Sequence, residues 1–164
     1  MALNSPADLF LYELSGMRDA ERRSGELLGE AMGQVRDTEL TETLREQQQK
    51  SAQKVNDIEA CFRVLGTSPQ EVPCAPVDGM RTEFETFLNQ QPAPEVLELY
   101  TLGTAMKLAS FGVAGYKELV DKSVLMGETQ CAQILQTNLV QKEEDAGRLE
   151  RISHDMSQRV LATS

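Results

Sequence analysis

The chain has 164 residues, 40% of them apolar and 26% charged, a composition typical of one globular domain with a hydrophobic core. Its net charge of −10 argues against a nucleic-acid partner and an anionic membrane surface, because both need a basic face. No run of about 18 apolar residues could span a membrane. Since no apolar signal segment is present and the three cysteines form no CxxC motif, we expect a cytoplasmic protein with free thiols.

Capping residues and glycine or proline breaks predict five helices. Ser5 and Pro6 form a helix start, whereas Gly66 and Gly127 are favourable residues directly after a helix. The predicted helices span residues 6 to about 35, 37 or 38 to 65, 78 to about 88, 94 to 126 and 129 to about 160. No segment alternates with a period of two, so we predict no β-sheet.

Apolar residues recur every three or four positions in each of the four long helices, as at Leu99, Leu102 and Met106. This spacing is typical of a four-helix bundle. The link between the second and third long helices has about 25 residues, enough to cross the length of a bundle and make these helices parallel. We therefore predict that residues 1–164 form a single all-α domain, a ferritin-like four-helix bundle with one long crossover connection carrying a short extra helix.

The midpoints of these apolar stripes are polar. Seven residues share inward positions near the helix midpoints: Glu21, Gln47, Ser51, Lys54, Asn138, Lys142 and Asp145. A buried polar layer is costly unless its groups are paired. The two lysines and two carboxylates carry no net charge together, so we hypothesise a lysine–carboxylate network. In the alternative, the stripes are rotated by one position and some of these side chains face water.

Several short segments, in this order along the chain, resemble segments of a known protein family. They are Asp19-Ala20-Glu21, Val64-Leu65-Gly66, Cys74 with Gly79, Pro94-Glu95-Val96, Ala114-Gly115-Tyr116 and Ile134-Leu135-Gln136 with Leu139. The chain resembles the YciF/YciE-like family of bacterial ferritin-like proteins over nearly its whole length. The resemblance implies a homodimer of bundles, similarity to di-iron or di-manganese carboxylate proteins, and an association with bacterial stress conditions.

The resemblance also implies which positions hold metal ligands in the family, and at most of these positions this chain has a residue that is not a ligand. The first-helix ligand matches Glu21, and the second-helix positions fall at Gln47, Ser51 and Lys54. The third-helix run falls on residues 109–112, which contain no acid or histidine. In the fourth helix, Lys142 stands where a carboxylate is expected. We therefore expect no catalytic, cofactor-binding or metal-binding residue.

We expect a non-catalytic protein with a structural or interaction role and a protein partner. In an alternative, a shifted register in the fourth helix lets Glu21, Glu143, Glu144 and Asp145 hold iron or manganese in a divergent oxidoreductase. The small residues 109–115 predict either close helix packing or a space beside Gly112 that would suit a small-ligand carrier.

We expect Cys74, in a proline-bounded loop, to be exposed, and the single histidine, His154, to lie on the surface. The apolar residues 9–11 form an interface or cover the link segment.

Overall fold

The computed structural model describes residues 2–164, so Met1, the first residue of the predicted domain, lies outside it. The described chain forms five α-helices and no strand, which confirms the predicted all-α class. They are α1 (Pro6–Met32), α2 (Thr38–Leu65), α3 (Ala75–Leu88), α4 (Pro94–Leu125) and α5 (Thr129–Thr163). Within the described residues, no helix combines the length and the apolarity that a membrane span requires.

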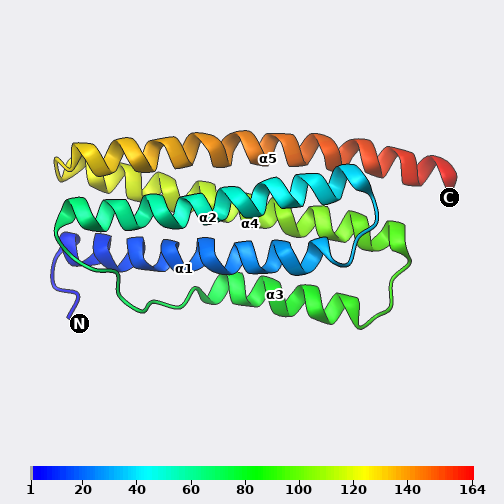
Figure 1. Cartoon of the computed structure of the whole chain (residues 1–164), viewed down its shortest axis with the longest axis horizontal. Helices are drawn as coiled ribbons and strands as arrows, with labels where there is room; N and C mark the ends of the chain where they lie inside the picture. Colours follow the sequence, from blue (N-terminus) through cyan, green and yellow to red (C-terminus); the bar gives the residue numbers. More distant parts are fainter. Residues whose placement is uncertain (1) are drawn as a thin grey trace.

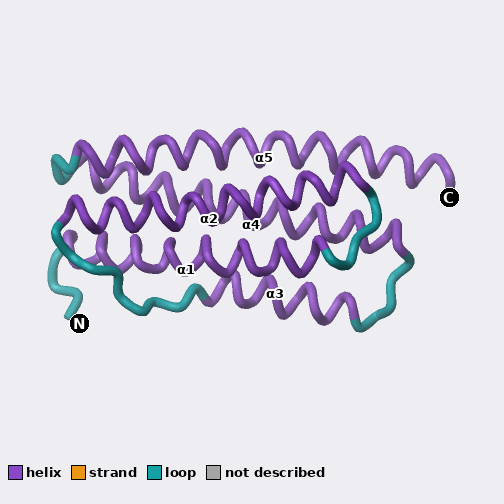
Figure 2. The backbone as a smooth tube through the Cα atoms, in the orientation of Figure 1, coloured by secondary structure: helices purple, strands orange, loops and turns teal. Residues whose placement is uncertain are grey.

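The four long helices lie side by side, and the short α3 packs on the outside of α1 (Figures 1 and 2). α1 and α5 run in one direction, whereas α2 and α4 both run in the other. The link after α2, together with α3, carries the chain back along the bundle before α4 begins. The predicted crossover topology is therefore confirmed.

Most helix ends follow the predicted capping residues. The Ser5 hydroxyl accepts a hydrogen bond from the backbone N–H of Asp8. Gly66 adopts the left-handed conformation, with φ of 70°, which terminates α2. Three predicted boundaries were wrong, and one of them is the end of α5, which continues to Thr163 rather than about 160. α1 ends at Met32 rather than Val35, because Gly33 begins a turn. α3 begins at Ala75 rather than Asp78, because the first turn of a helix tolerates a proline there.

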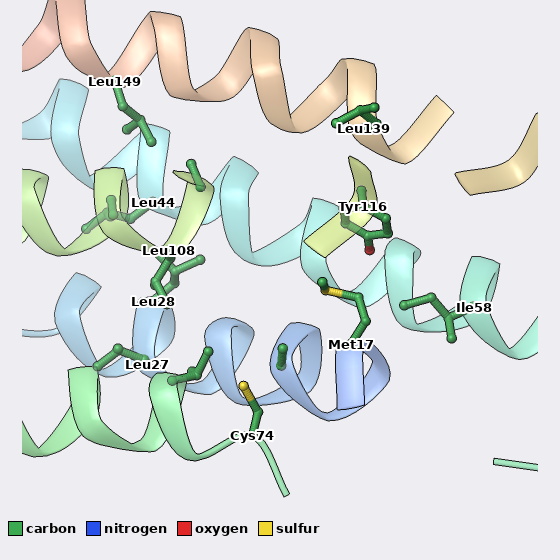
Figure 3. Close-up of a cluster of buried hydrophobic side chains, with 14 of the residues drawn as sticks. Met17, Leu27, Leu28, Leu44, Ile58, Cys74, Leu108, Tyr116, Leu139 and Leu149 are labelled. Carbon is green, nitrogen blue, oxygen red and sulfur yellow. The ribbon is translucent and has the colours of Figure 1, made fainter. Parts of the chain in front are cut away.

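Apolar layers flank the polar level of the bundle. Figure 3 shows Leu28, Leu44, Leu108 and Leu149 gathered at one end of the view, with Met17, Ile58, Tyr116 and Leu139 at the other. The side chains come from α1, α2, α4 and α5, so both layers join all four long helices. The polar level between these two layers is therefore shielded from water at both ends.

The apolar stripe predicted for α4, which follows the spacing of Leu99, Leu102 and Met106, was too narrow. Leu97, Ala105 and Leu108 lie outside that stripe and are buried, whereas Leu99 is only partly buried. The reason is that α4 packs against α3 as well as the bundle. Tyr100 stacks on Phe87 of α3 with ring centroids 3.7 Å apart.

The link before α3 is fastened to α1 by Asp19. Its Oδ2 accepts a hydrogen bond from the backbone N–H of Cys74 at 2.7 Å, and its carboxylate pairs with Arg22 and Arg23. Burial alone would raise the pKa of Asp19, but these three hydrogen bonds outweigh burial and lower it. Arg23 also pairs with Asp78 of α3. Cys74 is buried, so its predicted exposure was wrong.

A buried lysine–carboxylate layer as the candidate functional site

The structure buries all seven residues of the predicted polar layer. They come from α1 (Glu21), α2 (Gln47, Ser51, Lys54) and α5 (Asn138, Lys142, Asp145). Lys54 is 1% exposed and Lys142 is 6% exposed, so neither ammonium group reaches solvent in the usual way of a surface lysine. The stripes therefore face inward in the predicted rotation.

The centre of the layer is an ion pair between α5 and α1. Lys142 Nζ lies 3.0 Å from Glu21 Oε1, and both side chains are buried. The Tyr116 hydroxyl of α4 donates a hydrogen bond to the same oxygen at 3.2 Å. Burial and the Glu21 charge raise the pKa of Tyr116 well above its usual value, so this hydroxyl stays protonated. Glu21 is thus held by one cation and one neutral donor.

Gly112 makes room for Lys142. A Cβ atom at Gly112 would lie 2.9 Å from both Cδ and Cε of Lys142, closer than ordinary side-chain contacts allow. The lysine stem therefore lies directly on the backbone of α4. This contact explains why a glycine stands in the middle of α4, although glycine lowers the helix propensity of the segment.

Lys54 is a buried cation with a weaker partner. Its Nζ donates to Oε1 of Gln141 at 2.9 Å, an uncharged amide. Burial lowers the pKa of Lys54, and the nearby charge of Lys142 lowers it further, against the opposing effects of Glu21 and Asp145. Lys54 and Lys142 therefore lie in different electrostatic settings at one level of the bundle.

Asp145 pairs with a lysine that the sequence pattern did not place in the layer. Lys50 Nζ lies 2.7 Å from Asp145 Oδ1, and the Lys50 side chain remains 39% exposed. Lys50 stands at the edge of the α2 stripe and reaches inward. The predicted network of two lysines with two carboxylates thus has a third lysine as a member.

Four buried side-chain atoms of the layer have no hydrogen-bond partner among the described residues. They are Oε2 of Glu21, Nε2 of Gln47, and both amide atoms of Asn138. Asn138 nevertheless lies close enough to Tyr116 to influence the pKa of its hydroxyl. The layer therefore keeps unused hydrogen-bonding capacity at its centre.

The residues present do not fit a di-metal carboxylate centre. Glu143 and Glu144, which the shifted register would need, are exposed on the outside of α5. Residues 2–164 contain no group of three or more His, Cys, Asp or Glu side chains that could hold a metal ion. The two ammonium groups would repel a cation, and the Lys142 stem occupies the space beside Gly112.

The space beside Gly115 of α4 is also occupied by a side chain. A Cβ atom at Gly115 would meet Cε of Met17 at 1.9 Å, so the Met17 side chain occupies that position. A hollow of about 370 Å³ does border Gly115, between α1, α4 and the link, and Phe111 and Cys74 line it. The contacts at 112 and 115 support close packing. His154 is exposed.

Taken together, the crossover topology and the polar level at mid-bundle define a ferritin-like helical bundle protein. The chain belongs to the DUF892 family, a domain of unknown function whose profile matches residues 5–162. A comparison with functionally curated proteins gives no match.

Solved structures of similar fold support this assignment. The Escherichia coli stress protein YciF is 15% identical with a TM-score of 0.90, covering 95% of this chain and 99% of YciF. YcfI of Rhodopseudomonas palustris is 21% identical with a TM-score of 0.86, covering 90% and 94%. A two-domain Anabaena variabilis protein with DJ-1/ThiJ/PfpI-like and ferritin-like domains is 14% identical with a TM-score of 0.68, covering 94% of this chain and 38% of that protein. At these identities, the likeness concerns the fold.

Proposed function

We propose that this protein is a non-catalytic, ferritin-like helical protein with a structural or interaction role in bacterial stress physiology. The observation that carries the proposal is the Lys142–Glu21 pair, seated on Gly112 where a di-metal centre would need ligands. The similarity to the E. coli stress protein YciF and to YcfI, named as a candidate structural protein, supports the physiological part.

The chemistry of the layer supports a structural role. Lys142 supplies a positive charge that is covalently tethered and cannot exchange, whereas a metal could be lost or replaced. A buried ion pair of this kind adds little net stability but can specify one register of the helices. Removing one partner is strongly destabilising, so both must be kept together.

We also propose that the protein is a cytoplasmic homodimer. Of the apolar residues 9–11, Phe10 is buried in the core, whereas Leu9 is 38% exposed, so only part of this segment is free apolar surface. The end of α4 offers more, since Val124 is 60% exposed and Leu125 is 78% exposed. Light scattering coupled to gel filtration tests the stoichiometry, and a monomer at micromolar concentration contradicts it.

Thermal unfolding with and without metal tests the proposal. We expect the melting temperature to change by less than about 1 °C on adding millimolar Mn(II), anaerobic Fe(II), or a chelator, because a ligand stabilises only the state that binds it. The Glu143→Gln/Glu144→Gln variant is the matched control and should behave identically. A rise of several degrees that this variant abolishes would show that the divergent di-metal alternative is correct.

A further inference from the structure

Two of the three cysteines meet in the interior. Cys61 lies in the last turns of α2, and Cys131 lies in the first turn of α5. Sγ of Cys131 lies 3.7 Å from the backbone oxygen of Cys61, and both residues are fully buried. Each thiol also lies close enough to the other to affect its pKa. Residues that are 70 positions apart in sequence therefore face each other across one helix interface.

The surroundings of this pair are apolar. Ile58, Phe62 and Leu135, from the same two helices, are buried in the same core. The pair lies outside the lysine–carboxylate layer and takes no part in the function proposed above. A disulfide is neutral, so it fits such surroundings better than a thiolate does.

We propose that Cys61 and Cys131 form an intramolecular disulfide when the protein meets a two-electron oxidant such as hydrogen peroxide. In the first step, one thiol is oxidised to a sulfenic acid as the O–O bond of the peroxide breaks and one water leaves. In the second, the other sulfur attacks the sulfenic sulfur, the S–S bond forms and a second water leaves. Two thiols and one peroxide thus give one disulfide and two waters.

Burial controls the rate of this reaction. It raises the pKa of the Cys61 thiol to about 12, so almost no thiolate is present at neutral pH and oxidation is slow. The same burial shields the finished bond from external thiols. The cross-link would tie the end of α2 to the start of α5 and enclose the crossover, α3 and α4.

Cys74 provides an internal comparison. It is buried at 7% exposure but lines the hollow between α1, α4 and the link, so reagents can approach it from the surface. Its backbone N–H, rather than its thiol, holds the link to Asp19. Cys74→Ser therefore removes the competing thiol and keeps that contact.

Peptide mapping of the full chain tests the proposal. Wild type and Cys74→Ser are exposed to hydrogen peroxide for increasing times, unfolded, alkylated and digested with trypsin without reductant. We expect monomeric protein to give a cross-linked pair of peptides, 55–63 and 123–142, that lacks two hydrogens. In wild type, oxidation of Cys74 in peptide 64–81 should appear before this cross-link.

The cross-linked protein should also melt roughly 5–15 °C higher, because the bond closes a long loop in the unfolded chain. This rise in melting temperature should disappear after the disulfide is reduced in denaturant. It should also be absent from the Cys61→Ala and Cys131→Ala variants made in the Cys74→Ser background. The proposal is overturned if Cys61 and Cys131 remain free after Cys74 is fully oxidised. Sulfinic acid on either residue without a cross-link, or cross-links only between chains, also overturns it.

Discussion

Replacing Gly112 with alanine perturbs the layer at its most crowded point. The added Cβ would lie 2.9 Å from two carbons of Lys142, so the stem must move from its place above Glu21. Alanine in a helix gains about 1 kcal/mol over glycine. Overpacking costs about 1–3 kcal/mol, and a buried carboxylate left without its cation costs about 3–5 kcal/mol. We expect Gly112→Ala to lower the unfolding free energy by up to about 2 kcal/mol if the stem shifts with its ion pair intact, and by about 3–7 kcal/mol if the pair is broken.

Urea unfolding followed by circular dichroism measures this change. Gly103 is the matched control, since it lies in the same helix and a Cβ there would meet nothing within 4 Å. Gly103→Ala should therefore stabilise the protein by up to about 1 kcal/mol. In a Lys142→Ala background the stem is gone, so Gly112→Ala should stabilise as the control does. If Gly112→Ala stabilises the otherwise unchanged protein as Gly103→Ala does, the proposed seat for Lys142 is refuted.

Four other substitutions test the individual charges through their effect on the unfolding free energy. Lys142→Met should destabilise by about 3–5 kcal/mol, and adding Glu21→Leu should recover most of the loss; a further loss contradicts the pairing. Lys54→Met should instead stabilise by about 1 kcal/mol, because it removes a buried ammonium bound to an amide. Since the folded-state pKa of Lys54 is lowered, the contribution of Lys54 to stability should rise as pH approaches 10.5, against the opposite trend of the buried Cys61 and Tyr116. The difference in unfolding free energy between wild type and Lys54→Met should therefore shift in favour of wild type with rising pH. Asp19 has a lowered pKa in the folded state, so its contribution to the unfolding free energy is present above pH 3.8 and is lost as pH falls through the folded-state pKa. The loss of stability in acid should therefore be smaller for Asp19→Asn than for wild type.

Helix periodicity and capping chemistry explain how much of the fold could be predicted. The 3–4 spacing defines which face of a helix points inward, and it placed Lys54 and Lys142 in the interior. Capping residues such as Ser5 and Gly66 marked helix ends within a few positions. These signals are local, so one sequence carries them.

The partners across helices could not be predicted in the same way. Which lysine meets Asp145 depends on the axial register and rotation of α2 against α5, and Lys50 reaches in from the edge of its stripe. The sequence pattern did not place Tyr116 in the polar layer, although its hydroxyl donates a hydrogen bond to Glu21. The contact between Gly112 and the Lys142 stem, and the meeting of Cys61 with Cys131, likewise join distant segments without any local motif.

Metal content tests the central claim most directly. The protein is purified without chelator, loaded anaerobically with excess Fe(II) and Mn(II), desalted, and measured by plasma mass spectrometry. Because the Lys142 ammonium takes the cationic role beside Glu21, we predict less than about a tenth of a metal ion per chain. Two metal ions per chain, lost in a Glu21→Gln variant that still folds, would contradict the claim and make the carboxylate oxidoreductase the better account.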